Sequence, residues 1–372
     1  MSLILSGDSG ITFPNSSTQA VGFYGFKNRI INGAMVIDQR DAGASVTPVN
    51  QQYTLDRWLS IVGAASKFSI QQNAGSVTPP AGFTNYLGAT SLSAYSVAAG
   101  DVFGQETRIE GYNTADLAWG TANAKSITIS FWVYSSLTGS FGGVVRNNAN
   151  TRSYPFLFTV SSANTWTLIS VTVPGDTSGT WLTNNLSGVK VTFNLGTGST
   201  YSGTAGAWAS AEYYSATGAT SVVGTSGATF YITGVQLEAG STATSFDYRP
   251  YGTELVLCQR YYQAINFSEA QNTYTKWGTG VAYSTTNARI NVPLLVKMRT
   301  YPSLNVTSTA SNYGVYYLAD IACNTVPTIN PNSNPSVATI EASVAAGLTG
   351  GGAVLGQANN NQTAYLGFSA EL

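Results

Sequence analysis

The stretch Ala228-Thr-Phe-Tyr-Ile-Thr-Gly-Val-Gln-Leu-Glu238 decides the fold, because it has the composition of the last strand of a β-sandwich. β-Branched and aromatic residues dominate it, and both kinds favour a pleated, half-buried surface. A polar loop begins at Gly240, and the apolar residues Leu255 and Cys258 then return at helical spacing. We predict that one β domain ends here and that a short helix over 251–264 leads to a second module.

The composition of the 372-residue chain favours the same fold class. Hydrophobic residues make up 43%, enough for packed cores, and charged residues only 9%, against roughly 25% in an average soluble protein. The 39 glycines suit turns, while the 22 tyrosines and 15 phenylalanines suit strands. We predict an all-β protein: a jelly-roll β-sandwich, a short helix and a smaller C-terminal β domain, preceded by a short N-terminal attachment segment.

Strand signals recur along the chain before the closing stretch. The clearest lies over 126–134, where Ile127, Ile129, Phe131 and Val133 alternate with polar or aromatic residues. Side chains two apart share a face of a strand, so these four should point into a core. The other predicted apolar stretches and strands are 30–37, 55–62, 67–71, 102–110, 154–160, 166–173, 189–195 and 229–237.

These signals divide the chain into four parts. Residues 1–30 hold only short apolar pieces and cannot bury a core alone, whereas 31–250 carry the strands of the jelly roll. Residues 251–264 are the predicted connecting helix. Residues 265–372 are the predicted C-terminal β domain, with strands expected within 287–306, 313–318 and 363–372.

The connecting helix needs a surface against which to bury its apolar side. Thr253 is the predicted N-cap, and Leu255, Cys258 and Tyr262 fall on one side. That side packs either on the chain's own sandwich or on the same helix of sister chains around a threefold axis, and the sequence leaves both open. We expect Cys258 to be buried, because free Cys is among the most buried residue types.

Charge and residue usage exclude several classes of protein. The net charge is −1 and the 16 Lys and Arg residues form no run, so no nucleic-acid partner is expected. No segment approaches the ~20 apolar residues of a membrane span, so no membrane insertion is expected. The chain has no His, which excludes a Ser-His-Asp triad and a His-ligated zinc site. Cys258 and Cys323 lack the spacing of a metal-ligand pair, and no cofactor or metal is predicted.

An enzyme that cuts polysaccharide would need two carboxylates roughly 5–10 Å apart across a cleft. Glu106 and Glu110 share one face of a predicted strand with Arg108 between them, which places them ~13 Å apart by strand rise. We expect these three to form a ladder of alternating charge. Asp38 and Asp41 fall in a predicted loop, where turn capping or an ion pair is the ordinary role.

Aromatic residues in loops are the candidates for binding a sugar, because an indole or phenol ring offers a large, rigid contact area. The candidate residues in the jelly roll and in the C-terminal domain are Trp181, Trp208, Tyr213, Tyr214, Tyr313, Tyr316 and Tyr317. For the last three, two outcomes stay open: a patch at the tip of the C-terminal domain, or packing of each ring, which is the more ordinary fate. By contrast, Trp58, Trp132 and Trp166 lie in predicted strands and are expected in the core.

Four motifs follow one another within the predicted sandwich, namely Gln105-Glu-Thr-Arg-Ile-Glu-Gly-Tyr-Asn113, Ala124-Lys-Ser-Ile-Thr-Ile-Ser-Phe-Trp-Val133, Asn164-Thr-Trp-Thr-Leu-Ile169 and Phe230-Tyr-Ile-Thr-Gly-Val-Gln-Leu-Glu238. In this order they resemble the carbohydrate-binding-module-like jelly roll of bacteriophage tail-fibre and appendage proteins. Such modules usually carry Asp where Thr233 stands, so no ligand or metal role is carried over to that position. The segment 6–19, the corner 293–302 and the ending 368–372 also resemble parts of phage fibre proteins.

The resemblance implies a structural protein of the virion, extracellular and without catalysis. It implies a tail-fibre subunit, homotrimeric, that recognises a glycan on the host surface during adsorption. Residues 1–30 would then attach it to other virion proteins. Two alternatives remain: a capsid decoration or tail-assembly protein with a purely structural role, and a glycan depolymerase.

Overall fold

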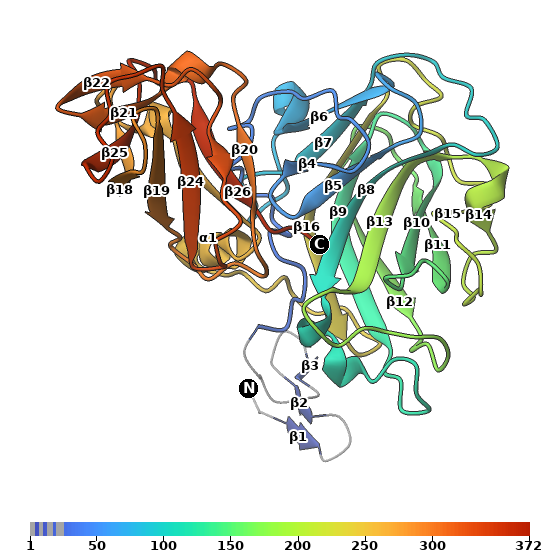
Figure 1. The fold of residues 1–372 in the computed structure, drawn as a ribbon. Coiled ribbons are helices and arrows are strands. Elements are labelled where there is room, and N and C mark those ends of the chain that lie inside the picture. Colours follow the sequence, from blue (N-terminus) through green and yellow to red (C-terminus); the bar gives the residue numbers. More distant parts are fainter. Residues whose placement is uncertain (1–3, 7–9, 13–17, 20–25) are drawn as a thin grey trace.

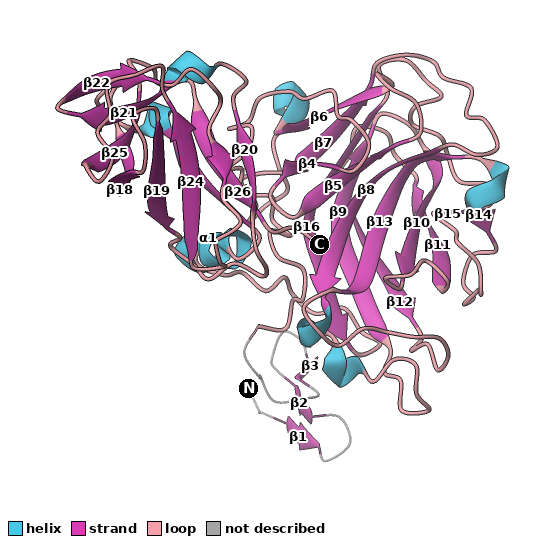
Figure 2. Ribbon diagram, viewed as in Figure 1, coloured by secondary structure: helices cyan, strands magenta, loops and turns pink. Residues whose placement is uncertain are grey.

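The computed structural model describes residues 4–6, 10–12, 18–19 and 26–372. Within them the chain is built of β-sheets, with a single α-helix, α1 (Tyr251–Gln259). Figure 2 shows two groups of strands side by side, a larger sandwich and a smaller C-terminal part, with α1 below the latter. The predicted all-β architecture is confirmed. The short 3-10 turns are η1 (Ala74–Ser76), η2 (Gly111–Asn113), η3 (Ala115–Leu117), η4 (Ser199–Tyr201), η5 (Phe267–Glu269) and η6 (Ala310–Asn312).

Two antiparallel sheets form the jelly-roll sandwich, shown in blue to green-yellow in Figure 1. The six-stranded sheet has the order β11-β10-β13-β8-β5-β4 and the five-stranded sheet the order β12-β9-β16-β7-β6. Strands of the first are β4 (Gln52–Leu55), β5 (Trp58–Val62), β8 (Val102–Glu110), β10 (Gly139–Arg146), β11 (Ser153–Val160) and β13 (Ser187–Thr197). Strands of the second are β6 (Phe68–Gln72), β7 (Leu87–Ser91), β9 (Ile127–Ser135), β12 (Thr167–Val173) and β16 (Thr229–Ala239).

The core of the sandwich lies between these two sheets. The predicted inward residues of β9, Ile127, Ile129, Phe131 and Val133, are all fully buried there. Trp58 of β5 is also fully buried, as expected. Trp132 and Trp166 are only partly buried, because β9 turns Trp132 to the outer face and Trp166 packs on the outer tyrosines.

Several predicted elements differ in the structure. The apolar stretch 30–37 is a turn rather than a strand, with Asn32 and Met35 at φ 58°. The sequence pattern also missed β7 and β10. In β10, Gly143 is required by close packing, since a Cβ there would lie 2.3 Å from Cζ of Phe156.

The connecting helix is shorter than predicted. It ends at Gln259, and Tyr262 begins the strand β17 (Tyr262–Asn266). Pro250 rather than Thr253 occupies the N-cap position, where no side chain caps the helix. Cys258 is fully buried, as predicted.

The C-terminal part contains a seven-stranded sheet of order β22-β21-β25-β18-β19-β24-β23 and a three-stranded sheet of order β17-β26-β20. A second hydrophobic core lies between them, and Cys323 is buried in it. The remaining strands are β18 (Lys276–Ala282), β19 (Asn287–Pro293), β20 (Ser303–Val306), β21 (Tyr313–Tyr317), β22 (Ala319–Ala322), β23 (Thr328–Ile329), β24 (Val337–Ser343), β25 (Ala353–Ala358) and β26 (Tyr365–Ser369).

A small three-stranded sheet, β1 (Ile4–Ser6), β2 (Gly10–Thr12) and β3 (Thr18–Gln19), lies below the sandwich in Figure 1. Most of the predicted attachment segment 1–30 lies outside the described residues.

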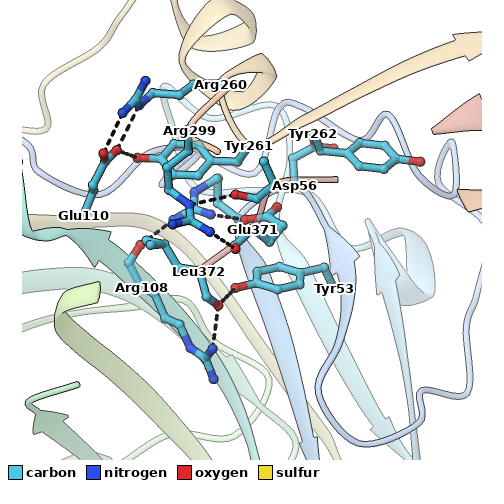
Figure 3. A network of polar contacts seen from close by, with 12 residues as sticks. Tyr53, Asp56, Arg108, Glu110, Arg260, Tyr261, Tyr262, Arg299, Glu371 and Leu372 are labelled. Carbon is cyan, nitrogen blue, oxygen red and sulfur yellow. Dashed lines mark hydrogen bonds and ion pairs between the residues drawn. The ribbon is translucent and has the colours of Figure 1, made fainter. Parts of the chain in front are cut away.

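Charged side chains buried between the two parts join them (Figure 3). Glu371, which follows β26, pairs with Arg57 and, at 2.8 Å, with Arg40, both from the sandwich. In the other direction Glu110 of β8 accepts hydrogen bonds from Arg260 at 2.6 Å and from the Tyr261 hydroxyl at 2.6 Å. Each part therefore places a carboxylate against arginine side chains of the other.

Main-chain carbonyls complete this junction. Arg299 donates to the carbonyl oxygens of Ala370, at 2.8 Å, and Glu371, at 2.6 Å. Arg108, at 2.5 Å, and the Tyr53 hydroxyl, at 2.8 Å, donate to the main-chain oxygen of Leu372. The end of β26 and the residues after it are thus held on the sandwich, near the label C in Figure 1.

Candidate functional site

Three tryptophans meet where the loops gather at one end of the sandwich. Trp119 follows η3, Trp181 lies between β12 and β13, and Trp208 lies between the short strands β14 (Ser202–Gly203) and β15 (Ser215–Ala216). Their ring centroids are 4.6 Å apart for Trp119 and Trp181 and 5.5 Å apart for the other two pairs, with interplanar angles of 79–80°. Edge-to-face contacts of this kind are favourable beyond the area they bury. We call these three residues the tryptophan cluster.

Hydrogen bonds fix the orientation of each ring in the tryptophan cluster. The indole N–H of Trp119 donates to the Lys125 carbonyl at 2.7 Å, that of Trp181 to Ser178 at 3.1 Å and that of Trp208 to Pro174 at 2.8 Å. Trp119 is buried, whereas Trp181 and Trp208 are partly exposed. The two outer indoles therefore present preoriented apolar surface to solvent, with their polar N–H groups already satisfied.

Polar groups surround the tryptophan cluster. Arg152 pairs with both carboxylate oxygens of Asp176 at 2.7 Å, donates to Ser210 Oγ at 2.7 Å and lies 5.9 Å from the Trp208 ring centroid. Tyr154 also packs on Trp208, at 5.2 Å between centroids. Aromatic faces flanked by hydroxyl and guanidinium groups can stack on the apolar side of a sugar ring and hydrogen-bond its edge.

A segment over 199–216, which contains Trp208, crosses the outer face of the six-stranded sheet. The ring of Tyr214 stacks on the guanidinium of Arg146, with 3.5 Å between the guanidinium carbon and the ring centroid. Tyr213 packs over Gly203, where a Cβ would lie 2.3 Å from Cδ2 of the ring. The predicted residues Tyr213 and Tyr214 are thus partly buried and engaged in holding this segment in place.

Beneath that segment, three cations stand in one row across adjacent strands. The register pairs Arg146 of β10 with Lys190 of β13, and Lys190 with Arg108 of β8. Like charges directly opposite one another on a sheet are destabilising unless they are compensated. Glu106 provides one compensating carboxylate, since it binds Arg108 at 2.7 Å, Arg146, and the Thr192 hydroxyl at 2.9 Å.

The pKa values of Glu106 and Lys190 in this row are both lowered, for different reasons. Burial alone would raise the pKa of Glu106, but the charges of Arg146, Arg108 and Lys190 lower it to about 2. Burial lowers the pKa of Lys190 to about 8, although Glu106 acts in the opposite sense. Glu106 is therefore ionised at neutral pH. The pKa of Lys190, by contrast, lies close to neutral pH.

The predicted patch of three tyrosines at the tip of the C-terminal domain does not form. Tyr313 is fully buried and donates its hydroxyl to the Tyr365 carbonyl at 2.8 Å. Tyr316 is 40% exposed and lies near the Lys276 ammonium, 4.7 Å from the ring centroid. Neighbouring residues of a strand face opposite ways, so Tyr317 cannot share a face with Tyr316.

Of the carboxylates weighed as an enzyme pair, Glu106 pairs with Arg108 as expected. Glu110 instead binds Arg260 of the C-terminal part, so the predicted ladder of three charges extends only over Glu106 and Arg108. The Asp38 carboxylate caps a turn, accepting hydrogen bonds from the backbone N–H groups of Asp41 at 3.0 Å and Gly43 at 2.6 Å.

An open groove of about 400 Å³ also lies at the junction between the two parts. Its lining includes Tyr53, Arg108, Arg299 and Tyr301. Hydrogen bonds already commit both arginines there to main-chain oxygens. This groove therefore offers a ligand less free hydrogen-bonding capacity than its size suggests.

Two further features bear on function. Across the ranges that the structure describes, no group of three Cys, Asp or Glu side chains is placed to hold a metal ion. None of the helices found in those ranges has the length and apolar character needed to cross a membrane.

Sequence patterns pointed to Trp181 and Trp208, which the fold brings together. They missed Trp119, Arg146 and Lys190. Trp119 lies in the irregular stretch between η3 and β9, where the sequence shows no alternating pattern. The three cations come from strands that are far apart in the sequence. The only local signal was Arg108 between two glutamates.

Fold and site together define a class: a two-part all-β protein whose jelly-roll sandwich carries a tryptophan cluster and a row of cations at one end. Among solved structures, the chain is similar to the enzymatically active domain of tailspike protein 4 of Bacteriophage CBA120, with TM-score 0.32 and 10% identity over 57% of this chain and 22% of that one. It is similar to a putative sugar binding protein of Bacteroides thetaiotaomicron, with TM-score 0.34 and 12% identity over 57% of this chain and 100% of that one. It is also similar to a family 11 carbohydrate-binding module of Clostridium thermocellum, with TM-score 0.28 and 14% identity over 52% and 96% of the two chains.

The chain spans less than a quarter of the length of the tailspike domain to which it is similar. No protein-family model matches the sequence, and no curated protein matches it.

Proposed function

We propose that this protein is a non-catalytic subunit of a bacteriophage tail fibre or related appendage that binds a host-surface glycan through its jelly-roll sandwich. The observation that carries the glycan-binding part is the tryptophan cluster. Trp181 and Trp208 keep part of their surface in solvent although Trp119 anchors them. Partly exposed indoles fixed by satisfied N–H groups lose little conformational freedom when a ligand binds.

The non-catalytic part of the proposal is supported by two buried carboxylates of β8. Glu106 and Glu110 are each bound to an arginine, and the pKa of each is lowered although burial acts to raise it. A carboxylate held by arginine in this way has a lowered proton affinity and serves poorly as a general acid. The virion location, the attachment through residues 1–30 and the homotrimer rest on the resemblance of the motifs and ends of the sequence to phage fibre proteins.

The first test is binding of the purified protein to an array of bacterial surface polysaccharides, followed by calorimetry on the best binder. We expect Trp181→Ala and Trp208→Ala each to weaken binding by roughly tenfold or more, as loss of a central aromatic anchor does. Tyr251→Ala is the matched control, because Tyr251 is an aromatic residue that is 63% exposed on α1, away from the tryptophan cluster.

The same samples distinguish the alternatives. New reducing ends released from the bound polysaccharide would establish a depolymerase and contradict the non-catalytic assignment. A folded protein that binds no glycan and does not block phage adsorption would favour a capsid decoration or tail-assembly role. Light scattering on the full chain measures the oligomeric state.

A further inference from the structure

The cation row beneath the segment 199–216 is short of negative charge. Arg146 and Lys190 are 1% and 7% exposed. Within the part of the chain that the structure describes, Lys190 donates only to neutral oxygens, the Asn148 carbonyl at 2.8 Å and Asn150 Oδ1 at 3.0 Å. Glu106 is the buried carboxylate near both, and it also serves Arg108. Buried cations without matched anions are costly, so this arrangement favours any further anion that reaches them.

Arg146 has hydrogen-bonding capacity left for such an anion. Its Nε and Nη1 atoms are buried and have no hydrogen-bond partner among the residues that the structure describes. The nearest additional carboxylate is Glu212, whose Oε1 lies 3.9 Å from Nη1, beyond hydrogen-bonding distance. That oxygen is held elsewhere, by Asn150 Nδ2 at 2.9 Å and the Tyr214 hydroxyl at 2.8 Å.

Glu212 stands at the solvent side of this site. Its side chain is 40% exposed, whereas that of Arg146 beneath it is 1% exposed. The ring of Tyr214 stacks on the face of the Arg146 guanidinium. Glu212 is therefore the partly exposed group at the edge of that guanidinium.

The same stretch of chain also carries the tryptophan cluster. Ser210, two residues before Glu212, is bound by Arg152, and Arg152 in turn lies beside Trp208. Trp208 and Glu212 are four residues apart, so their Cα atoms lie at most about 14 Å from each other. One oligosaccharide of a few sugars can therefore reach from the indole of Trp208 to the carboxylate of Glu212.

Resting on the function proposed above, we infer that the ligand is an acidic glycan: one sugar stacks on Trp181 and Trp208, and the carboxylate of a neighbouring sugar replaces Glu212 against Arg146 and Lys190. A carboxylate matches the guanidinium edge of Arg146 and the ammonium of Lys190. A phosphate or sulfate substituent offers the same anionic oxygens. The test therefore compares carboxylate, phosphate and sulfate.

The test compares matched pairs of probes on the full chain by isothermal titration calorimetry at two ionic strengths. Polygalacturonate oligosaccharides are compared with the same preparation after carboxyl reduction, and glucuronate with glucose. The acidic member of at least one pair should bind about fivefold more tightly or better, as expected for one added charge contact near the surface. The difference should shrink at high salt. Glucose 6-phosphate and glucose 6-sulfate identify the preferred anion.

Variants then locate the effect. Glu212→Gln removes the competing carboxylate and should tighten binding of the acidic probe by about threefold or more. Glu341→Gln removes the same charge from an exposed ion pair on the C-terminal part and should change nothing. Both positions are partly exposed, so both variants should fold, which circular dichroism checks.

Equal binding, or no binding, of the acidic and neutral members of both pairs overturns the inference. So does a preference for phosphate or sulfate over carboxylate. If a neutral array glycan then still binds in a Trp208-dependent way, the proposed function stands without the acidic specificity. If nothing on the array binds, both fail.

Discussion

At the residue scale, Glu106 joins three strands of the six-stranded sheet, β8, β10 and β13. It lies on the outer face of β8, yet it is fully buried beneath the segment 199–216 and binds two arginines and a threonine. The sequence predicted its partnership with Arg108, because the two are neighbours on one strand face. It could not predict Arg146, which comes from β10 and meets Glu106 only through the order of the sheet.

Glu106→Gln should destabilise the protein by about 3 kcal/mol or more, because it leaves Arg146 and Lys190 buried without their carboxylate. The pKa of Glu106 is lowered from 4.5 to about 2 in the folded protein. The stability from its charge is therefore complete above about pH 4.5 and is lost as the pH falls toward 2. Urea denaturation from pH 7 to pH 2 should show less acid destabilisation in the variant than in the wild type. Parallel profiles for the two proteins would contradict this.

At the element scale, a glycine in β10 is required by packing, whereas a glycine in α1 is not. Strand β10 was missed in the sequence because Gly139, Gly142 and Gly143 interrupt its apolar pattern and glycine disfavours strands. The structure shows that ring packing and strand pairing occupy the space where a side chain at Gly143 would stand. Strands β9 and β13, with clear alternation, were predicted to within two residues of their ends. Contacts between distant strands, which local patterns do not record, decide such cases.

Gly252→Ala and Gly143→Ala should therefore change stability in opposite directions. A Cβ at Gly252, in α1, would meet no atom within 4 Å, so alanine there should stabilise by up to about 1 kcal/mol through its higher helix propensity. At Gly143 the same change forces Phe156 to move and should cost about 1–3 kcal/mol. Thermal unfolding of the two variants beside the wild type measures both effects. Equal shifts would refute the distinction.

At the scale of the whole molecule, the junction couples two hydrophobic cores that the chain builds separately. The sequence indicated two β modules and a helix between them, from composition and spacing alone. It did not indicate that the last residues return to the sandwich, since Glu371 and Arg57 are 314 positions apart. The buried pairs there have the geometry of a fixed joint rather than of a flexible linker.

Glu371→Ala should uncouple the two parts by leaving Arg57 buried without its carboxylate, at a cost of about 3–5 kcal/mol. Calorimetry should then resolve two unfolding transitions, where we expect a single one for the wild type. Arg289→Ala is the control, because it breaks an exposed pair, 46% and 31% exposed, and such pairs contribute less than about 1 kcal/mol. A single, unshifted transition in Glu371→Ala would show that the joint does not depend on this pair.

The chain has only two cysteines, and each lies in a different structural unit: Cys258 on the buried side of α1 and Cys323 in the C-terminal core. Burial raises the pKa of both thiols, that of Cys323 to about 12. Neither can react with an alkylating reagent until its surroundings open, because the thiolate is the reactive form. The rate at which an alkylating reagent modifies Cys258 therefore measures how often the joint opens. The rate of modification of Cys323 measures how often the C-terminal part opens. Mass spectrometry of the wild-type protein during alkylation would measure both rates in one experiment.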